Sequence, residues 1–358
     1  MLAQRKRYCY ISLLVVLIWS CESNYNFFKG EYRYQPYTGE IVSVTATPTG
    51  FDALGVTSLR IEDSILVAHF YYDSEVLLSA YSLRTEELLC KNLMLKGNGP
   101  NEYMYANFVN LYTDTVGGKL WVKVSVSRKL LCIDLTESIR KGSVVVTQEI
   151  DLWQFEDHSS LLTAFIHSDS SLVLLNIHDN TEISIGNFHT GQKAFYDWMF
   201  SEDVLHRSED VFLSSVYLYN EQKKLLAGGM AFLDQVNFLS LSPEGERFSA
   251  STKPKPLRFR SLLERYTDYN AAPTYYTGIC CSDNYLICKY SGGESGYERA
   301  ENEAVYDFLH IFNWEGDLLK IIALDRVVSG IAFDSRSHTI YGIDSEGDIV
   351  KYTLPLID

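Results

Sequence analysis

Four histidines in this sequence have a regular spacing that could bring metal ligands together. His158, His167, His178 and His189 follow one another at intervals of 9, 11 and 11 residues. Imidazole is a common zinc ligand, but local zinc sites use ligands that lie only a few residues apart. Along β-strands these intervals are too long for one local site, and polar strand ends account for them better. We therefore predict no metal site and no bound cofactor.

A second group of reactive side chains is a cluster of carboxylates late in the chain: Asp283, Glu294, Glu298, Glu301 and Glu303. Paired carboxylates serve glycosidases as acid and nucleophile, and carboxylate oxygens also hold calcium. Spacing alone does not bring these groups face to face, so a solvated acidic loop is the favoured interpretation. No G-x-S-x-G segment supplies a hydrolase nucleophile. We predict no catalytic residues.

Five cysteines remain besides Cys9 and Cys21, namely Cys90, Cys132, Cys280, Cys281 and Cys288. Cys280 and Cys281 are adjacent, and no C-x-x-C pair has a histidine partner, which argues against zinc. A disulfide from Cys280 or Cys281 to Cys288 would fit neighbouring strands. Buried free thiols are the favoured interpretation.

Aromatic residues are abundant, with 25 Tyr, 18 Phe and 5 Trp. Tyr275, Tyr276 and Tyr297 lie in or beside an apparent insertion, where loops would reach over one mouth of a ring-shaped fold. Aromatic ring faces with scattered acids suit the capture of a glycan or a peptide. These three tyrosines are the candidate ligand-binding residues, although packing between blades is the favoured interpretation for any single ring.

The stretch KGNGPNEY, residues 96–103, has the glycines of a phosphate-binding loop. Such a loop needs a following helix and a Lys-Ser or Lys-Thr pair, whereas strand-like residues follow here. Gly97 and Gly99 allow a sharp turn, Pro100 ends strand pairing, and Glu102 is placed to cap backbone donors. We interpret this stretch as a structural corner between two sheets.

Most of the chain consists of short runs of β-branched and aromatic residues that end at turn residues, which predicts an all-β protein. A turn recurs at Glu86, Glu137, Gly191, Gly245, Gly316 and Gly347, with spacings of 51, 54, 54, 71 and 31 residues. This period is typical of a β-propeller, and six turns predict a six-bladed β-propeller. The last blade shows three strands. Residues 39–47, GEIVSVTAT, are expected to add the fourth, so that an N-terminal strand closes the ring.

The N-terminus predicts export and a lipid anchor. Arg5, Lys6 and Arg7 precede a short apolar run, and the residues before Cys21 resemble a lipobox, so residues 1–20 are predicted to be a lipoprotein signal peptide. In such signals the cysteine is acylated, which makes Cys21 the predicted lipid attachment site and the lipid the only membrane anchor. Residues 21–38 are expected to form a polar tether, and residues 39–358 the propeller.

Two segments carry a family resemblance. Residues 97–103, GNGPNEY, and residues 312–355, which include SGIAFD and TIYGID, resemble six-bladed TolB-like and NHL-like β-propeller lipoproteins of Bacteroides-group bacteria. The resemblance extends over most of residues 40–356 and is strong at these two places. Members are mostly of unassigned function, so the resemblance implies a fold and a location rather than an activity. The implied location is the cell envelope, where the protein would be an outer-membrane lipoprotein on either the periplasmic or the surface face.

The sequence is acidic, with a formal net charge of −15, and it has no basic cluster beyond the leader. An acidic surface repels phosphate backbones, so nucleic acid is excluded as a partner. The predicted function is a non-catalytic binding or interaction module for a peptide, a small protein or a glycan. Two alternatives stay open. One is an envelope hydrolase or lyase with carboxylates and histidines in the channel, and the other is a structural scaffold of an envelope complex.

Overall fold

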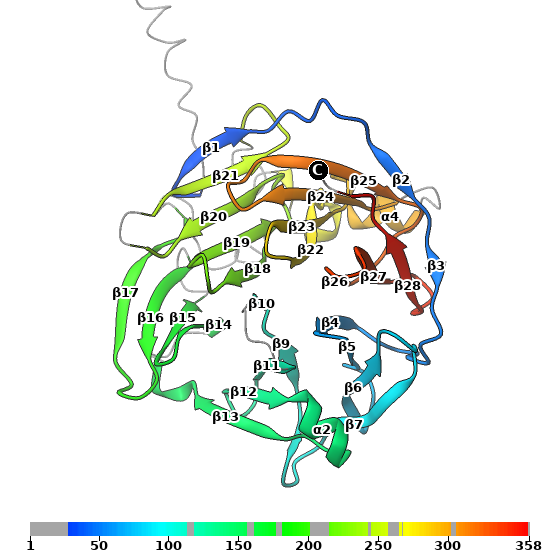
Figure 1. Ribbon diagram of the computed structural model, residues 1–358. Coiled ribbons are helices and arrows are strands. Elements are labelled where there is room, and N and C mark those ends of the chain that lie inside the picture. Colours follow the sequence, from blue (N-terminus) through cyan, green and yellow to red (C-terminus); the bar gives the residue numbers. More distant parts are fainter. Residues whose placement is uncertain are drawn as a thin grey trace, which may run out of the picture.

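The computed structural model describes residues 28–112, 118–155, 161–176, 181–200, 215–242, 245–256, 265–266, 268–301 and 306–356. Strands make up 53% of the structure and helices 6%, which confirms the all-β prediction. The strands form six sheets that are arranged around a common centre (Figure 1). The fold is a β-propeller.

We number the sheets 1 to 6 in chain order. Within each sheet, the strands are given from the innermost to the outermost. Sheet 1 contains β4 (Ser58–Glu62), β5 (Ile65–His69), β6 (Val76–Ser82), β7 (Leu88–Lys96) and the short β8 (Glu102–Tyr103). Sheet 2 contains β9 (Ala106–Phe108), β11 (Lys119–Val124), β12 (Lys129–Asp134) and β13 (Val146–Asp151). Sheet 3 contains β14 (Leu161–Ser168), β15 (Ser171–Asn176), β16 (Glu182–Asn187) and β17 (Lys193–Trp198).

The second half of the chain follows the same plan. Sheet 4 contains β18 (Ser215–Asn220), β19 (Leu225–Met230), β20 (Val236–Ser240) and β21 (Arg247–Ser251). Sheet 5 contains β22 (Tyr276–Cys281), β23 (Tyr285–Tyr290), β24 (Phe308–Asn313) and β25 (Leu318–Leu324). Sheet 6 contains β26 (Ile331–Asp334), β27 (Thr339–Ile343) and β28 (Ile349–Thr353). Sheets 1 to 5 thus each take at least four strands from one segment of the chain and are complete blades, whereas sheet 6 takes only three.

The outer edges of sheets 4 to 6 are covered by an N-terminal strap, residues 31–48. Its strands are β1 (Glu31–Tyr34), β2 (Val42–Val44) and β3 (Thr47–Pro48), which run along the rim in Figure 1. β1 pairs in parallel with β21, and β2 pairs in parallel with β25. β3 pairs antiparallel with β28 and so gives sheet 6 a two-residue outer strand.

The strap corrects two boundaries expected from the sequence. Residues 31–34 lie within the predicted tether 21–38, yet they form a strand of sheet 4. The segment 39–47 was expected to complete the last blade as one strand. It instead contributes β2 to sheet 5, and only its last residue belongs to β3. The reason is that outer sheet edges expose unpaired backbone groups, and an extended segment can satisfy several of them in succession.

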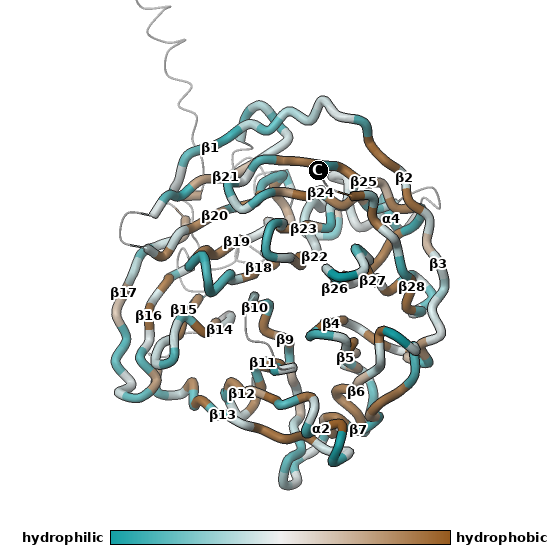
Figure 2. Tube along the Cα trace, in the orientation of Figure 1, coloured by the Kyte–Doolittle hydropathy of each residue, from teal (hydrophilic) through white to brown (hydrophobic). Residues whose placement is uncertain are grey.

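The hydrophobic core lies between neighbouring sheets, and Figure 2 shows the hydrophobic residues gathered in the strands. Val67 of sheet 1 packs in one cluster with Leu120 of sheet 2. Leu66 of sheet 1 packs in another cluster with Tyr341 of sheet 6, so the first and last sheets are in contact. Neighbouring residues of one strand are thus buried on opposite faces of their sheet. Burial on both faces produces the near-continuous apolar runs of the sequence.

The recurrent turns occupy two different places in the sheets. The turns at Glu86, Gly191, Gly245 and Gly316 each connect the third and fourth strands of a sheet. Gly347, although it sits in a near-identical Glu-Gly-Asp triplet, connects the second and third strands of sheet 6. Gly316 and Gly347 both have a φ of +88°, which glycine adopts without strain. The short final spacing of 31 residues therefore reflects a different turn.

The prediction of a turn at Glu137, the second of the six in chain order, is wrong, because these residues form helix α2 (Leu135–Lys141). The Asp134 side chain accepts a hydrogen bond from the Glu137 backbone N–H and caps the helix. Gly142 ends the helix in the left-handed conformation at φ +70°. An acidic N-cap and a C-terminal glycine are ordinary helix signals, so this helix was readable from the sequence. The other described helices are α4 (Gly296–Glu301), η1 (Trp153–Phe155) and η4 (Tyr269–Ala271).

The stretch 97–103 is the corner between the outer strand of sheet 1 and the inner strand of sheet 2. The Glu102 carboxylate accepts a hydrogen bond of 2.8 Å from the Gly99 backbone N–H. A Cβ atom at Gly97 or Gly99 would overlap this carboxylate. The left-handed residue of the corner is Asn101, at φ +62°. The two glycines therefore make room for the Glu102 side chain. Pro100 lies between β7 and β8, where strand pairing is interrupted.

Candidate functional site

The centre of the propeller is crossed by a short strand. After β9 the chain turns inward, and β10 (Leu111–Tyr112) pairs in parallel with β18 of sheet 4. The Asn110 carbonyl accepts from the Tyr219 N–H at 2.9 Å, and its side-chain amide donates to the Tyr217 carbonyl at 3.2 Å. This crossing links the segment that follows β9 of sheet 2 to the inner strand of sheet 4.

The two ends of the ring differ. One end carries the turns between the first and second strands and between the third and fourth strands of each sheet, and it is called the turn end. The other end carries the connections between the second and third strands and between successive sheets, and it is called the crossover end. A meander of antiparallel strands places these connections at opposite ends.

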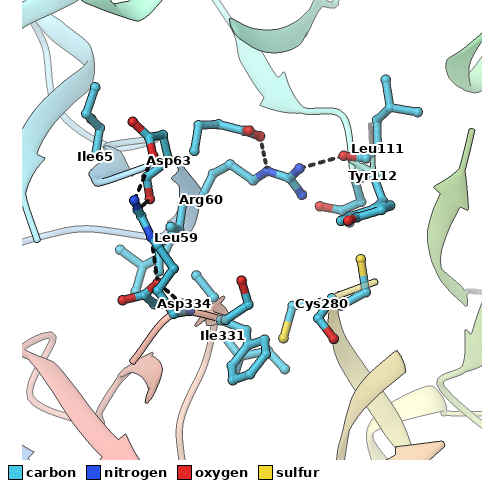
Figure 3. Close-up of a pocket in the computed structure, with 18 of the residues that line it drawn as sticks. Leu59, Arg60, Asp63, Ile65, Leu111, Tyr112, Cys280, Ile331 and Asp334 are labelled. Carbon is cyan, nitrogen blue, oxygen red and sulfur yellow. Dashed lines mark hydrogen bonds and ion pairs between the residues drawn. The ribbon is translucent and has the colours of Figure 1, made fainter. Parts of the chain in front are cut away.

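A cavity of about 600 Å³ lies between the crossing and the inner strands β4, β22 and β26 (Figure 3). Its rim is formed by exposed residues of the turn end, Asp63, Ser335 and Arg336, so it opens at that end. Volumes of this size are usual for small-molecule and cofactor sites. β4, β22 and β26 are each the terminal strand of their sheet, so each turns an edge with unpaired backbone groups to the centre.

Arg60 is the central charged group of the cavity. Its Nε donates to the Glu62 carboxylate at 2.7 Å, and its NH2 group donates to the Leu111 carbonyl at 2.6 Å. The second bond ties sheet 1 to the crossing strand, as Figure 3 shows. Burial alone would lower the pKa of Arg60, but the Glu62 carboxylate outweighs it and raises the pKa. The guanidinium is therefore a fixed and mostly buried positive charge.

A second ion-pair network lies at the cavity rim. Arg336 contacts the Asp63 carboxylate at 2.7 Å and the Asp334 carboxylate at 3.7 Å. Asp63 belongs to sheet 1 and Arg336 to sheet 6, so this network spans the junction of the first and last sheets (Figure 3). The cavity thus combines charges of both signs with apolar wall residues such as Ile331 and Phe333.

The two adjacent cysteines line the cavity, but they are not activated. All five cysteines in the described part of the chain are free thiols, four of them buried and Cys281 partly exposed. Burial raises the pKa of Cys281 to about 12 and that of Cys280 well above its ordinary value. Both stay protonated at neutral pH, and a protonated thiol is a poor nucleophile. No histidine belongs to the described lining of this cavity.

The candidate tyrosines do not form one site. Tyr276 is fully buried in the core between sheets 4 and 5, where its hydroxyl lies 3.1 Å from His310 Nδ1 and 3.4 Å from an Asp234 oxygen. It is therefore a packing residue, which corrects its expected place at a ring mouth. Tyr275 is partly buried against the same core. Tyr297 is exposed at the crossover end, and its hydroxyl donates to Asp268 at 2.5 Å.

The predicted carboxylate cluster is dispersed. Glu298 accepts from the Ser295 N–H at 2.7 Å at the start of α4, and Glu294 pairs with Arg299 at 3.8 Å. Asp283 accepts a hydrogen bond from Tyr112 of the crossing strand. Among the residues that the structure describes, no three His, Cys, Asp or Glu side chains gather as metal ligands. Cys21, His158, His178 and Glu303 lie outside the described residues.

Sequence reasoning missed Arg60, Glu62 and the crossing strand. The segment SLRIED carries a charged residue between Leu59 and Ile61 on a strand, so an arginine directed away from the core was visible there. Its hydrogen bond to the Leu111 carbonyl, 51 residues later, could not be predicted from the sequence.

Fold and cavity together define an all-β propeller with a ligand-sized space beside its axis. The model of the family described as TolB-like 6-blade propeller-like matches residues 57–336. The chain belongs to this family.

Two solved structures are similar to this chain. A member of the DUF4221 family from Bacteroides vulgatus covers 87% of this chain and 95% of its own length, at 14% identity and a TM-score of 0.52. A protein from Bacteroides fragilis that is described as exported covers 91% of this chain and 98% of its own, at 11% identity and a TM-score of 0.48. At such identities the likeness concerns the fold alone. A comparison with curated proteins found no match. None of the described helices is both long and apolar enough to cross a bilayer.

Proposed function

We propose that this protein is a non-catalytic binding module of the bacterial cell envelope, anchored by a lipid on Cys21, whose central cavity takes a segment of peptide chain. The signal-like N-terminus and the family support the envelope location, and so does the exported protein of similar fold from Bacteroides fragilis. An outer-membrane position remains part of the proposal.

One observation carries the choice of ligand. Three sheet-edge strands, β4, β22 and β26, surround a single cavity that also holds the fixed charge of Arg60. Edge strands offer alternating N–H and C=O groups, which are the partners of an extended peptide backbone. The charges of both signs at the rim suit the charged side chains or termini of a peptide. A purely apolar ligand would leave these groups unpaired.

Binding rather than catalysis follows from the state of the reactive groups. The carboxylates of Glu62, Asp63 and Asp334 are each paired with an arginine. The thiols of the cavity are protonated, as argued above. A base and a nucleophile within hydrogen-bond reach, the minimum for a hydrolase, are therefore not assembled by these residues.

The proposal is tested with the full-length protein in detergent and a display library of random hexapeptides. Synthetic copies of the enriched peptides are then titrated calorimetrically against the wild type, Ser335→Trp and Ser143→Trp. Ser335 is an exposed rim residue, so the tryptophan fills the cavity mouth without disturbing the core. Ser143 is also exposed but lies outside the cavity lining.

We expect Ser335→Trp to weaken peptide binding at least about tenfold, which corresponds to about 1.4 kcal/mol, and Ser143→Trp to leave it unchanged. Mass spectrometry of the bound peptides should find them intact. Cleaved peptides would establish the hydrolase alternative. If no peptide is enriched, or if enriched peptides bind Ser335→Trp as tightly as the wild type, the cavity is not a peptide site.

A further inference from the structure

The exposed aromatic side chains gather at one end of the ring. Nine aromatic side chains of the described residues are strongly exposed. Seven of them lie in connections of the crossover end, namely Tyr71, Tyr72, Tyr105, Trp153, Tyr269, Tyr297 and Tyr306. The cavity opens at the opposite end, so these rings belong to a different surface. Exposed apolar side chains indicate an interaction surface where they are contiguous.

Three of these rings form a contiguous group, which we call the aromatic platform: Tyr71, Tyr72 and Tyr105. The rings of Tyr71 and Tyr105 are stacked, with centroids 5.8 Å apart and planes inclined by 30°. Tyr72 meets Tyr71 edge to face at 5.0 Å. Tyr72 is 84% exposed, so most of its ring surface is open to solvent. The platform joins the connection between β5 and β6 to the connection between sheets 1 and 2.

The platform is held rigidly by the backbone around it. The Asp73 carboxylate accepts from the N–H groups of Glu75 and Val76 at 2.7 and 2.8 Å, and these bonds lower the pKa of Asp73. The Lys96 ammonium donates to the carbonyls of Tyr71 and Asp73 at 2.9 and 2.8 Å. The exposed rings are therefore preorganised, and a ligand would not bear the entropic cost of ordering this loop.

The corner 97–103 also serves the platform. Its glycines and Glu102 fix the path of the chain from β7 into the connection that carries Tyr105. Lys96, the last residue of β7, lies 6.0 Å from the centre of the Tyr105 ring. A sequence motif that looks purely structural therefore sets the position of an exposed ring.

We propose that the aromatic platform binds a neutral glycan. A pyranose ring presents a flat face of C–H groups, which stacks on an aromatic ring, and a rim of hydroxyls that need polar partners. The platform offers both kinds of contact, because Asp73, Ser74 and Glu75 beside the rings are exposed and polar. The same carboxylates, in a chain with a net charge of −15, disfavour an acidic glycan.

A protein partner fits the platform less well. A stable protein interface buries about 800 Å² on each partner and has a largely uncharged centre. Here three rings stand beside charged side chains, and the residues between Tyr72 and Val76 are all polar. The connection that carries Tyr71 and Tyr72 offers no free strand edge, since β5 and β6 each have a neighbouring strand on both sides in sheet 1. This glycan site is independent of the peptide proposed for the cavity.

The test uses the full-length protein in detergent on an array of neutral and acidic oligosaccharides, followed by calorimetric titration of the retained sugars. Tyr72→Ala removes the most exposed ring, and Tyr72→Phe keeps the ring but removes its hydroxyl. Tyr34→Ala is the matched control, because Tyr34 is 47% exposed on the strap, away from the platform. Thermal unfolding of each variant establishes that it is folded.

We expect neutral oligosaccharides to be retained, with affinity reduced about tenfold in Tyr72→Ala and within about threefold of wild type in Tyr72→Phe. Tyr34→Ala and the cavity variant Ser335→Trp should bind the sugar as the wild type does, which separates this site from the cavity. The proposal is overturned if no glycan is retained, if only acidic glycans are retained, or if folded Tyr72→Ala binds the retained sugar as tightly as the wild type. Loss of a polypeptide partner in Tyr72→Ala, without any bound sugar, would assign the platform to protein contacts instead.

Discussion

Acidification should destabilise this protein through its buried histidines, and for His310 the structure allows the size of the effect to be worked out. His310 lies in the core of sheet 5, stacked on Tyr290 with ring centroids 4.1 Å apart. Burial lowers the pKa of His310 from 6.5 to about 3. The folded protein therefore holds a neutral imidazole at pH 5, whereas the unfolded chain binds a proton there.

The sign follows from this difference in proton binding. Since the unfolded state binds more protons below pH 6.5, the stabilisation is complete above that pH and is lost as the pH falls towards 3. At pH 5 the loss from His310 is about 2 kcal/mol, taking 1.36 kcal/mol for each unit of pH below the unfolded pKa. His69 behaves in the same way, because burial, with the nearby Lys96, lowers its pKa to about 4.

The assay is urea unfolding at pH 7.5 and pH 5.0, for the wild type and for His310→Gln, which does not titrate. The variant should be less stable at pH 7.5, because it alters the contact with Tyr276, but its stability should fall by about 2 kcal/mol less on acidification. His189→Gln, a change at an exposed histidine, is the control and should keep the wild-type loss. Equal losses in the wild type and in His310→Gln would refute the reasoning.

Two further outcomes test the corner and the cavity thiols. Gly97→Ala forces the Glu102 carboxylate away from the Gly99 N–H and should lower the free energy of unfolding by about 1.5–3 kcal/mol, as for a lost charged hydrogen bond. In a Glu102→Ala background the same change should cost markedly less, and additive costs would contradict the overlap. Cys281, although partly exposed, should react with iodoacetamide at pH 8 at least about tenfold more slowly than free cysteine, because its thiol is protonated. Rapid labelling of Cys281 in the native protein, located by peptide mapping, would show that the thiol is activated.

The class of fold was readable from the sequence because strand pattern and turn chemistry are local. The register of the repeat, that is, which pair of strands each turn connects, was harder to read from the sequence. Gly316 and Gly347 have the same φ and almost the same neighbours, yet they occupy different turns of their sheets. A tight turn specifies how two strands reverse direction, and it carries no information about which strands of a sheet they are.

The central cavity could not be predicted from the sequence for a related reason. β10 is only two residues long, and it pairs with β18 about a hundred positions later in the chain. Nothing near Leu111 in the sequence indicates that partner, and the segment looks like the continuation of an ordinary strand. Arg60 is likewise meaningful only because the Leu111 carbonyl meets it across the centre. Non-local pairing of this kind leaves no periodic signal.

The proposed anchor also fits the use of both ring ends. On lipid attachment at Cys21, the chain to Phe28 spans at most about 25 Å, at about 3.5 Å per residue. Phe28 bridges to Phe200 and leads into β1 on sheet 4, so the chain reaches the propeller at its rim. The attachment point therefore lies at neither end of the ring, so the anchor itself covers neither the cavity at the turn end nor the platform at the crossover end.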